Sequence, residues 1–257
     1  MTIQYVAPTG VTGGATDRTR IQAALTTGGT VVLSGTYYIN AGLTITAANT
    51  SLVGTGWDTV INCTADTFAA VTVGGTYDRR VRVADLRISG GLDGVAVVGG
   101  ADLAIPTQDV VIDHVVADGQ ANAAVLLSNA RDCTVNRLSS IGAAIGLEVT
   151  NEAHRNVIAN SRITSWTSYG VYVHDDETYG GHSLRVTDCN ILIGTGTGIM
   201  ANSGQDYGGL IVKGCYIGTI TGYGIQANHS TVRIDGNVIE SCTLGGIKVA
   251  ATPFVSK

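Results

Sequence analysis

The amino-acid sequence predicts an all-β fold, a single-stranded right-handed parallel β-helix with one short helix that caps its N-terminal end. Glycine supplies 35 of the 257 residues and charged residues only 14%, whereas a helical bundle needs many charged residues and little glycine. Aliphatic anchors recur 22 to 29 residues apart. A constant unit with loops of variable length is typical of a solenoid, because insertions bulge outward without breaking the stack. The anchors are Val83, Ile112, Val135, Ile158, Val186, Val212 and Ile234.

Residues 1–29 are predicted to form the N-terminal cap, built around the helix. The open end of a solenoid exposes strand edges and core side chains, so a helix at this place is expected to plug it. The signals are an apolar stripe at helical spacing, two candidate N-caps and a glycine stop: Ile21, Ala24 and Leu25; Thr16 or Asp17; and Gly28 with Gly29.

Residues 30–250 are predicted to form the β-helix itself. Its first part is irregular in sequence, but short apolar runs bounded by turn residues predict strands at 30–33, 37–39, 43–45, 51–53, 59–62 and 70–73. Together with the regular units they give roughly eight or nine coils, hence a rod of about 40 Å at the strand spacing of a sheet. A β-propeller is the main rival, but its blades need about 40 residues and four strands each.

Each regular unit contains columns of equivalent residues. The position two residues after the anchor favours Asn, Asp and Gly, which tolerate a left-handed backbone, so it predicts a sharp bend. The position five residues after the anchor is mostly aliphatic and predicts an inward ladder that includes Ile163, Ile191, Ile217 and Ile239. The second half of the unit is Gly-Φ-x-Φ, where Φ is aliphatic, which predicts a strand with one face in and one face out.

Residues 251–257 are predicted to be a tail that is too short to plug the C-terminal end. We therefore expect this end to be covered by further copies of the chain, a trimer being one arrangement, or by another protein.

Several other classes of function are disfavoured. A net charge of −5, with the only basic cluster at residues 79–82, argues against a nucleic-acid partner. No apolar run reaches the length of a membrane span, the five cysteines lack zinc spacing, and nothing indicates a cofactor.

Two motifs at the N-terminus resemble a known opening. Residues 14–25 (GATDRTRIQAAL) and 28–37 (GGTVVLSGTY) are similar to the capping helix and first coil of pectate-lyase-superfamily β-helices, where an AIQAAL helix precedes a GGTVxLPxGTY strand and turn. Residues 52–56 (LVGTG) resemble that family's LxGxG element. The resemblance implies the β-helix fold over nearly the whole chain. It leaves function open, because the fold hosts lyases, hydrolases, epimerases and non-enzymatic phage spikes.

The catalytic signatures of the superfamily are incomplete in this chain. Residues 112–114 (IDH) resemble a pectate-lyase fragment, but no RxPxxR follows and His114 falls in the bend column. Residues 175–176 (DD) and 181–182 (GH) match fragments of the polygalacturonase set, whose other members are missing, and the DPH of alginate epimerases does not occur.

One region nevertheless concentrates chemistry-bearing side chains. The outward positions of the Gly-Φ-x-Φ strands hold Glu148, Tyr172, Met200, Gln226 and Lys248, and the resemblance implies that this sheet lines the substrate groove. Glu148 and Asp175, one coil apart, are the candidate acid and base or nucleophile for glycoside cleavage. A run of three acidic residues, 175–177, could instead hold a cation through oxygen ligands or only keep the rod soluble. The candidate glycan- or partner-binding residues are Tyr172, His174, Asp176, Glu177, Tyr179, Trp166, Tyr169 and Tyr223.

Three functions remain open: a phage virion protein (tailspike, minor tail or head-decorating), a carbohydrate-active enzyme, and a surface adhesin. The first residues show no secretory signal, which an exported enzyme or adhesin would need, whereas a virion protein assembles in the host cytoplasm. We therefore expect a structural component of the virion, with polysaccharide as an optional ligand and other virion proteins or further copies at its C-terminal end. A lyase or glycoside hydrolase is the alternative.

Overall fold

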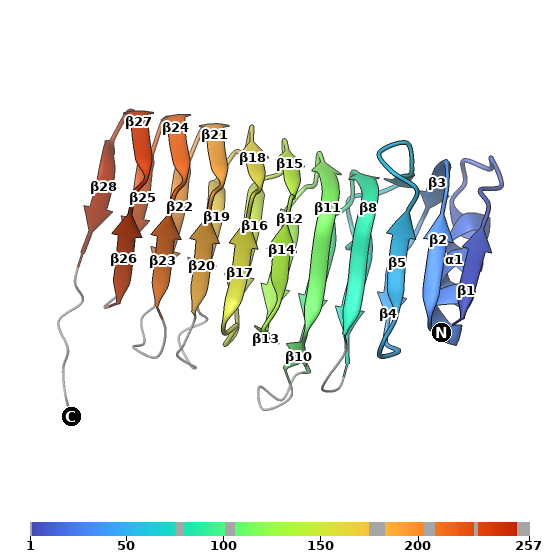
Figure 1. Cartoon of the computed structure of the whole chain (residues 1–257). Helices are drawn as coiled ribbons and strands as arrows, with labels where there is room; N and C mark the ends of the chain where they lie inside the picture. The colour runs from blue at the N-terminus through green and yellow to red at the C-terminus, as the bar shows by residue number, and fades with distance from the viewer. Residues whose placement is uncertain are drawn as a thin grey trace.

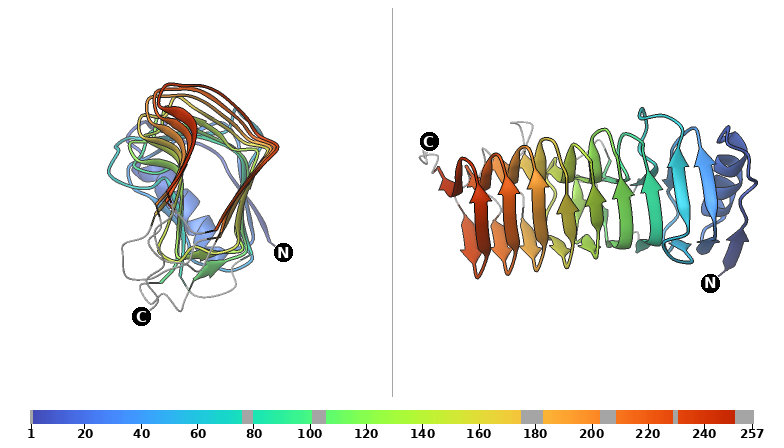
Figure 2. Two further views of the ribbon diagram at one scale, coloured as in Figure 1. Left: turned by 90° about the vertical axis from the view of Figure 1, so that its left-hand side faces the viewer. Right: turned by 90° about the horizontal axis from the view of Figure 1, so that it is seen from above.

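A computed structural model of the chain shows a rod of about nine stacked coils, with every strand parallel to its neighbours (Figure 1). The structure describes residues 2–75, 80–100, 106–174, 183–202, 209–228 and 231–250. In the view along the rod the coils lie over one another, and the side view places the helix at one end and the last coil at the other (Figure 2). The predicted β-helix is therefore confirmed.

Three rows of strands, which we call the first, second and third faces, enclose the core. The long strands β8 (Val81–Ser89) and β11 (Val110–Asp118) run through both the first and the second face. The first face also contains β1 (Ile3–Val6), β2 (Thr30–Leu33), β5 (Ser51–Gly54), β14 (Thr134–Asn136), β17 (Asn156–Ala159), β20 (Leu184–Thr187), β23 (Leu210–Lys213) and β26 (Val232–Asp235).

The remaining strands complete the other two faces and one corner. The second face contains β3 (Thr36–Ile39), β6 (Val60–Cys63), β15 (Ser139–Ile141), β18 (Arg162–Thr164), β21 (Asn190–Gly194), β24 (Tyr216–Ile220) and β27 (Val238–Cys242). The third face contains β4 (Leu43–Ile45), β7 (Val71–Gly74), β9 (Val95–Val98), β12 (Ala123–Ser128), β16 (Ile145–Thr150), β19 (Tyr169–His174), β22 (Thr197–Asn202), β25 (Tyr223–Ala227) and β28 (Gly245–Val249). A two-strand pair at the corner joins β10 (Thr107–Gln108) to β13 (Ala130–Arg131).

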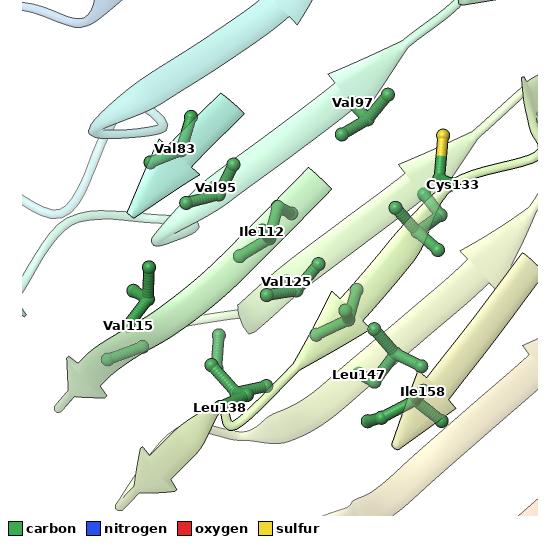
Figure 3. Close-up of a cluster of buried hydrophobic side chains, with 14 of the residues drawn as sticks. Val83, Val95, Val97, Ile112, Val115, Val125, Cys133, Leu138, Leu147 and Ile158 are labelled. Carbon is green, nitrogen blue, oxygen red and sulfur yellow. The ribbon is translucent and has the colours of Figure 1, made fainter. Parts of the chain in front are cut away.

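The core is a set of vertical ladders in which equivalent residues of successive coils stack. Ile163 pairs in register with Ile191, Ile191 with Ile217, and Ile217 with Ile239, as the sequence columns predict. Valine, leucine and isoleucine from all three faces meet inside the rod, and Cys133 lies among them (Figure 3). Cys189 and Cys215 are also buried. Small hydrophobes of repeated shape therefore fill a core that contains few aromatic side chains.

The bend column lies at the corner between the first and second faces and has the left-handed backbone that its residue types predict. The φ angles run from 51° to 57° at the five non-glycine members and are 62° and 66° at the two glycines. A β-strand interrupted by one left-handed residue turns sharply, which is how the two faces share one chain segment. The seven members are Asp85, His114, Arg137, Asn160, Asp188, Gly214 and Gly236.

The N-terminal end is closed by α1 (Ala15–Thr27) and β1, which pairs with β2. The prediction that Thr16 or Asp17 caps this helix is wrong, because the helix begins at Ala15 after Gly14 and has no side-chain cap. Asp17 instead lies buried inside the first turn and accepts hydrogen bonds from the backbone and hydroxyl of Thr9 and from the backbone N–H of Tyr38. It ties the entering chain to the first coil.

The C-terminal coil differs from the other end in its exposed apolar side chains. Leu244 is 62% exposed, Val249 55%, Val238 52% and Ile247 51%, and β26 and β28 pair on one side only among the described residues. Residues 251–257, the predicted tail, lie outside the described residues.

Candidate functional site

The outward column of the third face forms the predicted ladder. Glu148 pairs in register with Tyr172, Tyr172 with Met200, Met200 with Gln226, and Gln226 with Lys248. Two positions before each ladder residue, as the second residue of its strand, lies a glycine, and at Gly146, Gly170, Gly198 and Gly224 this position points inward together with the aliphatic residue after it. Consequently Tyr169 and Tyr172, although three positions apart, are outward neighbours on β19.

Three outward rings of β19 are stacked on one another. The ring centroids of Tyr169 and Tyr172 are 4.3 Å apart with an interplanar angle of 19°, and those of Tyr172 and His174 are 4.2 Å apart at 18°. Both faces of the middle ring are therefore covered, and a sugar could reach Tyr172 only at its edge and hydroxyl. Stacking restricts the side-chain rotamers of all three residues, so the phenol and imidazole groups are held in place before any ligand arrives.

Glu148, on the neighbouring strand β16, is fixed by two hydrogen bonds. The two atoms Glu148 Oε1 and His174 Nε2 are 2.8 Å apart, and the Asn122 side-chain amide donates to Glu148 Oε2 over 3.0 Å. Burial raises the pKa of the Glu148 carboxyl, but the hydrogen bonds from His174 and Asn122 outweigh it, so the pKa lies below its ordinary value. Glu148 is a carboxylate at neutral pH, oriented toward the ring stack.

Asp93 is a second carboxyl at this site, and the sequence analysis missed it. The Asn122 amide nitrogen that reaches Glu148 also donates to Asp93 Oδ1 over 2.9 Å, and the backbone N–H of Ala123 donates to the same oxygen. The carboxyl groups of Asp93 and Glu148 therefore lie within roughly 6 Å of each other. Burial, reinforced by repulsion from Glu148, raises the pKa of Asp93 against the lowering effect of its hydrogen bonds. Two carboxyls with pKa values displaced in opposite directions can act as proton donor and acceptor.

An open depression of about 400 Å³ adjoins the stack at the corner between the second and third faces. Its walls are mainly hydroxyl groups and glycine backbone, a surface suited to a neutral sugar because it offers hydrogen bonds without net charge. Tyr169 belongs both to this depression and to the stack. The lining residues are Ser168, Tyr169, Thr195, Gly196, Thr197, Thr221, Gly222 and Leu244.

The structure assembles part of the predicted site and corrects one member. Glu148, Tyr169, Tyr172 and His174 come together as described, and Tyr223 lies further along the same face with the Lys248 ammonium 5.1 Å from its ring centroid. Trp166 was expected to offer an aromatic face, and this is wrong: it is 1% exposed and its indole packs against Gly194 inside the rod.

The remaining predicted site residues, Asp175, Asp176, Glu177 and Tyr179, lie outside the described residues. Within the described part of the chain, no three His, Cys, Asp or Glu side chains are placed to hold a metal ion. No helix there is long and apolar enough to cross a bilayer.

Comparison with known proteins gives a family and several structural relatives. Residues 107–255 match the family model described as "Right handed beta helix region". No curated protein sequence matches the chain.

Solved structures share the fold at low identity. The enzymatically active domain of tailspike protein 2 of bacteriophage CBA120 is 13% identical, with a TM-score of 0.67 over 97% of this chain and 43% of that one. ORF18 of Geobacillus virus E2 is 14% identical, with a TM-score of 0.63 over 95% and 60%. The A-module of mannuronan C-5 epimerase AlgE6 from Azotobacter vinelandii is 14% identical, with a TM-score of 0.52 over 94% and 98%. The chain thus spans about half the length of the phage proteins it resembles.

Proposed function

Since this chain belongs to the family of proteins with a right-handed β-helix region, we propose that it is a phage virion component that binds a glycan on its third face. The observation that carries the proposal is the stack of Tyr169, Tyr172 and His174 beside Glu148, which adjoins the hydroxyl-lined depression. A flat face with prearranged rings and polar groups favours a sugar chain, because little side-chain entropy is lost on binding. Similarity in fold to a tailspike and to a phage ORF product supports the virion context.

Glycan binding is tested by a screen of polysaccharides against the purified full chain and a Tyr169→Ala variant. We expect binding that weakens about tenfold or more in the variant, because one ring of the stack and part of the depression are lost. Tyr5→Ala is the matched control, since Tyr5 is a tyrosine 80% exposed on the N-terminal strand β1. An equal loss in both variants, or no binding to any glycan, contradicts the proposal.

Placement in the virion is tested separately by negative-stain images of phage particles labelled with antibody to this chain. Labelling of the tail or the head supports the proposal, and labelling of neither contradicts it.

We further propose that copies of the chain, as a trimer in one arrangement, or another virion protein cover the exposed C-terminal coil. Sedimentation of the purified chain tests the first case: association that weakens on Leu244→Asp supports it, and a monomer at all concentrations contradicts it.

Glycan cleavage is the second candidate function, favoured by the carboxyl pair Asp93 and Glu148. Two carboxyl groups about 5.5 Å apart are the arrangement of retaining glycosidases, with one group ionised and the other protonated. If the pair is catalytic, Glu148→Gln and Asp93→Asn each lower the release of reducing ends at least about a hundredfold while glycan binding survives. Unchanged cleavage in both variants eliminates the pair, and binding without cleavage leaves the first function alone.

A further inference from the structure

A groove crosses the outer surface of the first face, on a different side of the rod from the third-face site. Two adjoining cavities of about 470 Å³ and 300 Å³ share Val157, Arg185 and Ile211 and so form one depression over β17, β20, β23 and β26. Figure 1 shows these four strands side by side near the C-terminal end of the rod. We call this depression the first-face groove.

Register explains how the groove is lined. Val157 pairs with Arg185, Arg185 with Ile211, and Ile211 with Arg233, so aliphatic and arginine side chains alternate along the rod. Arg185 and Arg233 are two strands apart, hence roughly 10 Å between their Cα atoms. Lys213 lies two residues beyond Ile211 and faces the same cavity. The apolar side chain of Ile211 therefore has a cationic side chain on three sides: Arg185, Arg233 and Lys213.

The charges of the groove are only partly balanced. Asp132 holds Arg155 through two contacts, at 2.7 and 2.5 Å, and Asp235 lies 3.7 Å from Arg233. Asp188 also lines the cavity and brings one negative charge to it. The Arg185 and Lys213 side chains make no hydrogen bond or ion pair with any described residue. Among the described residues the groove therefore has four cations against three carboxylates, a net positive charge in a chain whose net charge is −5.

From this arrangement we propose that the first-face groove binds an extended glycan that carries anionic groups. Guanidinium groups bind carboxylate, sulfate or phosphate through paired hydrogen bonds, and the Ile211 and Val157 side chains accept the apolar face of a sugar ring lying between two such groups. The coil repeat is comparable with the length of one sugar ring in an extended polysaccharide. Nucleic acid suits the groove less well, because none of the described residues that line it is aromatic and could stack on a base, and the net charge repels a phosphate backbone.

The proposal is tested by the affinity of the full chain for four polymers: a polyuronate, a sulfated glycan, a phosphorylated polysaccharide and neutral dextran. We expect at least one anionic polymer to bind, dextran not to bind, and affinity to fall as salt is raised. Arg185→Gln and Lys213→Gln should each weaken binding about tenfold, since each removes one charge-assisted contact. The three anionic arms identify which anionic group is recognised.

Arg162→Gln is the matched control, because Arg162 is an exposed strand arginine on the second face with no described partner. Thermal melts confirm that the variants stay folded. The proposal is overturned if no anionic polymer binds, if Arg162→Gln weakens binding as much as Arg185→Gln, or if single-stranded DNA binds as tightly as the best glycan. Loss of binding in Tyr169→Ala with none in Arg185→Gln also overturns it and assigns the ligand to the third face, so the two proposals fail separately.

Discussion

At the residue scale, the bend column shows how backbone conformation and side-chain contacts act together. Asn, Asp and Gly were expected there, but His114 and Arg137 adopt the same left-handed conformation. Each is compensated by its side chain: Arg137 makes two hydrogen bonds to Asp113, and His114 Nδ1 lies 2.9 Å from Asp85 Oδ1. The resemblance of residues 112–114 to a lyase fragment is thus explained by a turn with its own hydrogen bonds.

The His114 ring also positions an exposed tryptophan. The indole N–H of Trp57, which is 60% exposed, donates to His114 Nε2 over 2.6 Å. Substituting His114→Asn keeps a residue that tolerates the left-handed backbone but removes this acceptor. Acrylamide quenching of tryptophan fluorescence should then increase, while the free energy of unfolding changes by less than about 1 kcal/mol. Trp166 is buried, so a Trp57→Phe variant should lose the response; if it keeps the response, the assignment to Trp57 is wrong.

Acid unfolding should report on Asp113. Hydrogen bonds from Arg137, then Arg82 and Asn136, lower the pKa of Asp113 to about 2 despite partial burial. In the unfolded chain the pKa is near 3.9, so the ionised group stabilises the fold above about pH 4 and this contribution is lost as pH falls toward 2. Asp113→Asn should therefore cost about 1 kcal/mol at pH 7, since Arg137 is half exposed and screened, and nearly nothing at pH 2.

The measurement for Asp113 is urea unfolding at several pH values, with Asp58→Asn as control because Asp58 is exposed and has no described partner. If the stability difference between wild type and Asp113→Asn is the same at pH 2 and pH 7, the ion pair is not the cause.

The limits of sequence reasoning are also plainest at single residues. Glu148 was predictable as an outward position because strands alternate, but Asp93 precedes its strand and reaches Glu148 only through Asn122. No local pattern marks such a contact between coils. Trp166 was misassigned because it lies close in sequence to the candidate site residues, whereas the absence of a side chain at Gly194 makes internal room for it.

At the element scale, packing requires the glycine that is the second residue of strands β16, β19, β22 and β25. A Cβ built on Gly170 would lie 2.6 Å from Ile191 Cγ2, and equivalent glycines face Ile163, Ile217 and Ile239 in the same way. Where the chain has Ala124 instead, the residue at the corresponding position of the next coil is Ser140, which is small. The ladder of isoleucines and the column of glycines are thus two halves of one packing arrangement.

This relation predicts compensation between two core substitutions. Gly170→Ala should destabilise the protein by about 1 to 3 kcal/mol through overpacking, and Ile191→Ala by about 2 to 5 kcal/mol. The double variant should cost less than the sum by about 1 kcal/mol, because removing the isoleucine side chain admits the new methyl group. Chemical unfolding of the four proteins measures the coupling. Additive costs would show that the backbone oxygen of Gly198, also close to this position, sets the penalty alone.

Element boundaries were predictable where the pattern was local. Strands β2 and β4 coincide with the predicted ranges, and the other N-terminal strands agree within a residue or two. Strand β1 was not predicted, because its pairing with β2 depends on a contact across the intervening helix. The N-cap was misplaced for a similar reason: Asp17 is bound by Thr9 and Tyr38, which a scan of the helix alone does not reveal.

At the scale of the whole molecule, each coil contacts only its neighbours and the two ends are unequal. One end carries α1 and β1, whereas the last coil exposes its apolar side chains. Stability in such a stack is a sum of local terms, so opening starts at the less protected end. Hydrogen exchange followed by mass spectrometry should show faster exchange in residues 232–249 than in 110–149. Uniform exchange along the rod would mean that the solenoid opens only as one unit.

The shared register has a consequence for how such a chain can change in size. Because Ile112 and Val135 occupy the same place in successive coils, deleting residues 112–134 would join Val111 to Val135 and leave every remaining side chain with an equivalent neighbour. Tandem duplication of a similar stretch would add one coil in the same register. Proteins related to this one by descent can therefore differ in length by whole coils. Insertions or deletions of any other length are confined to the loops at the corners.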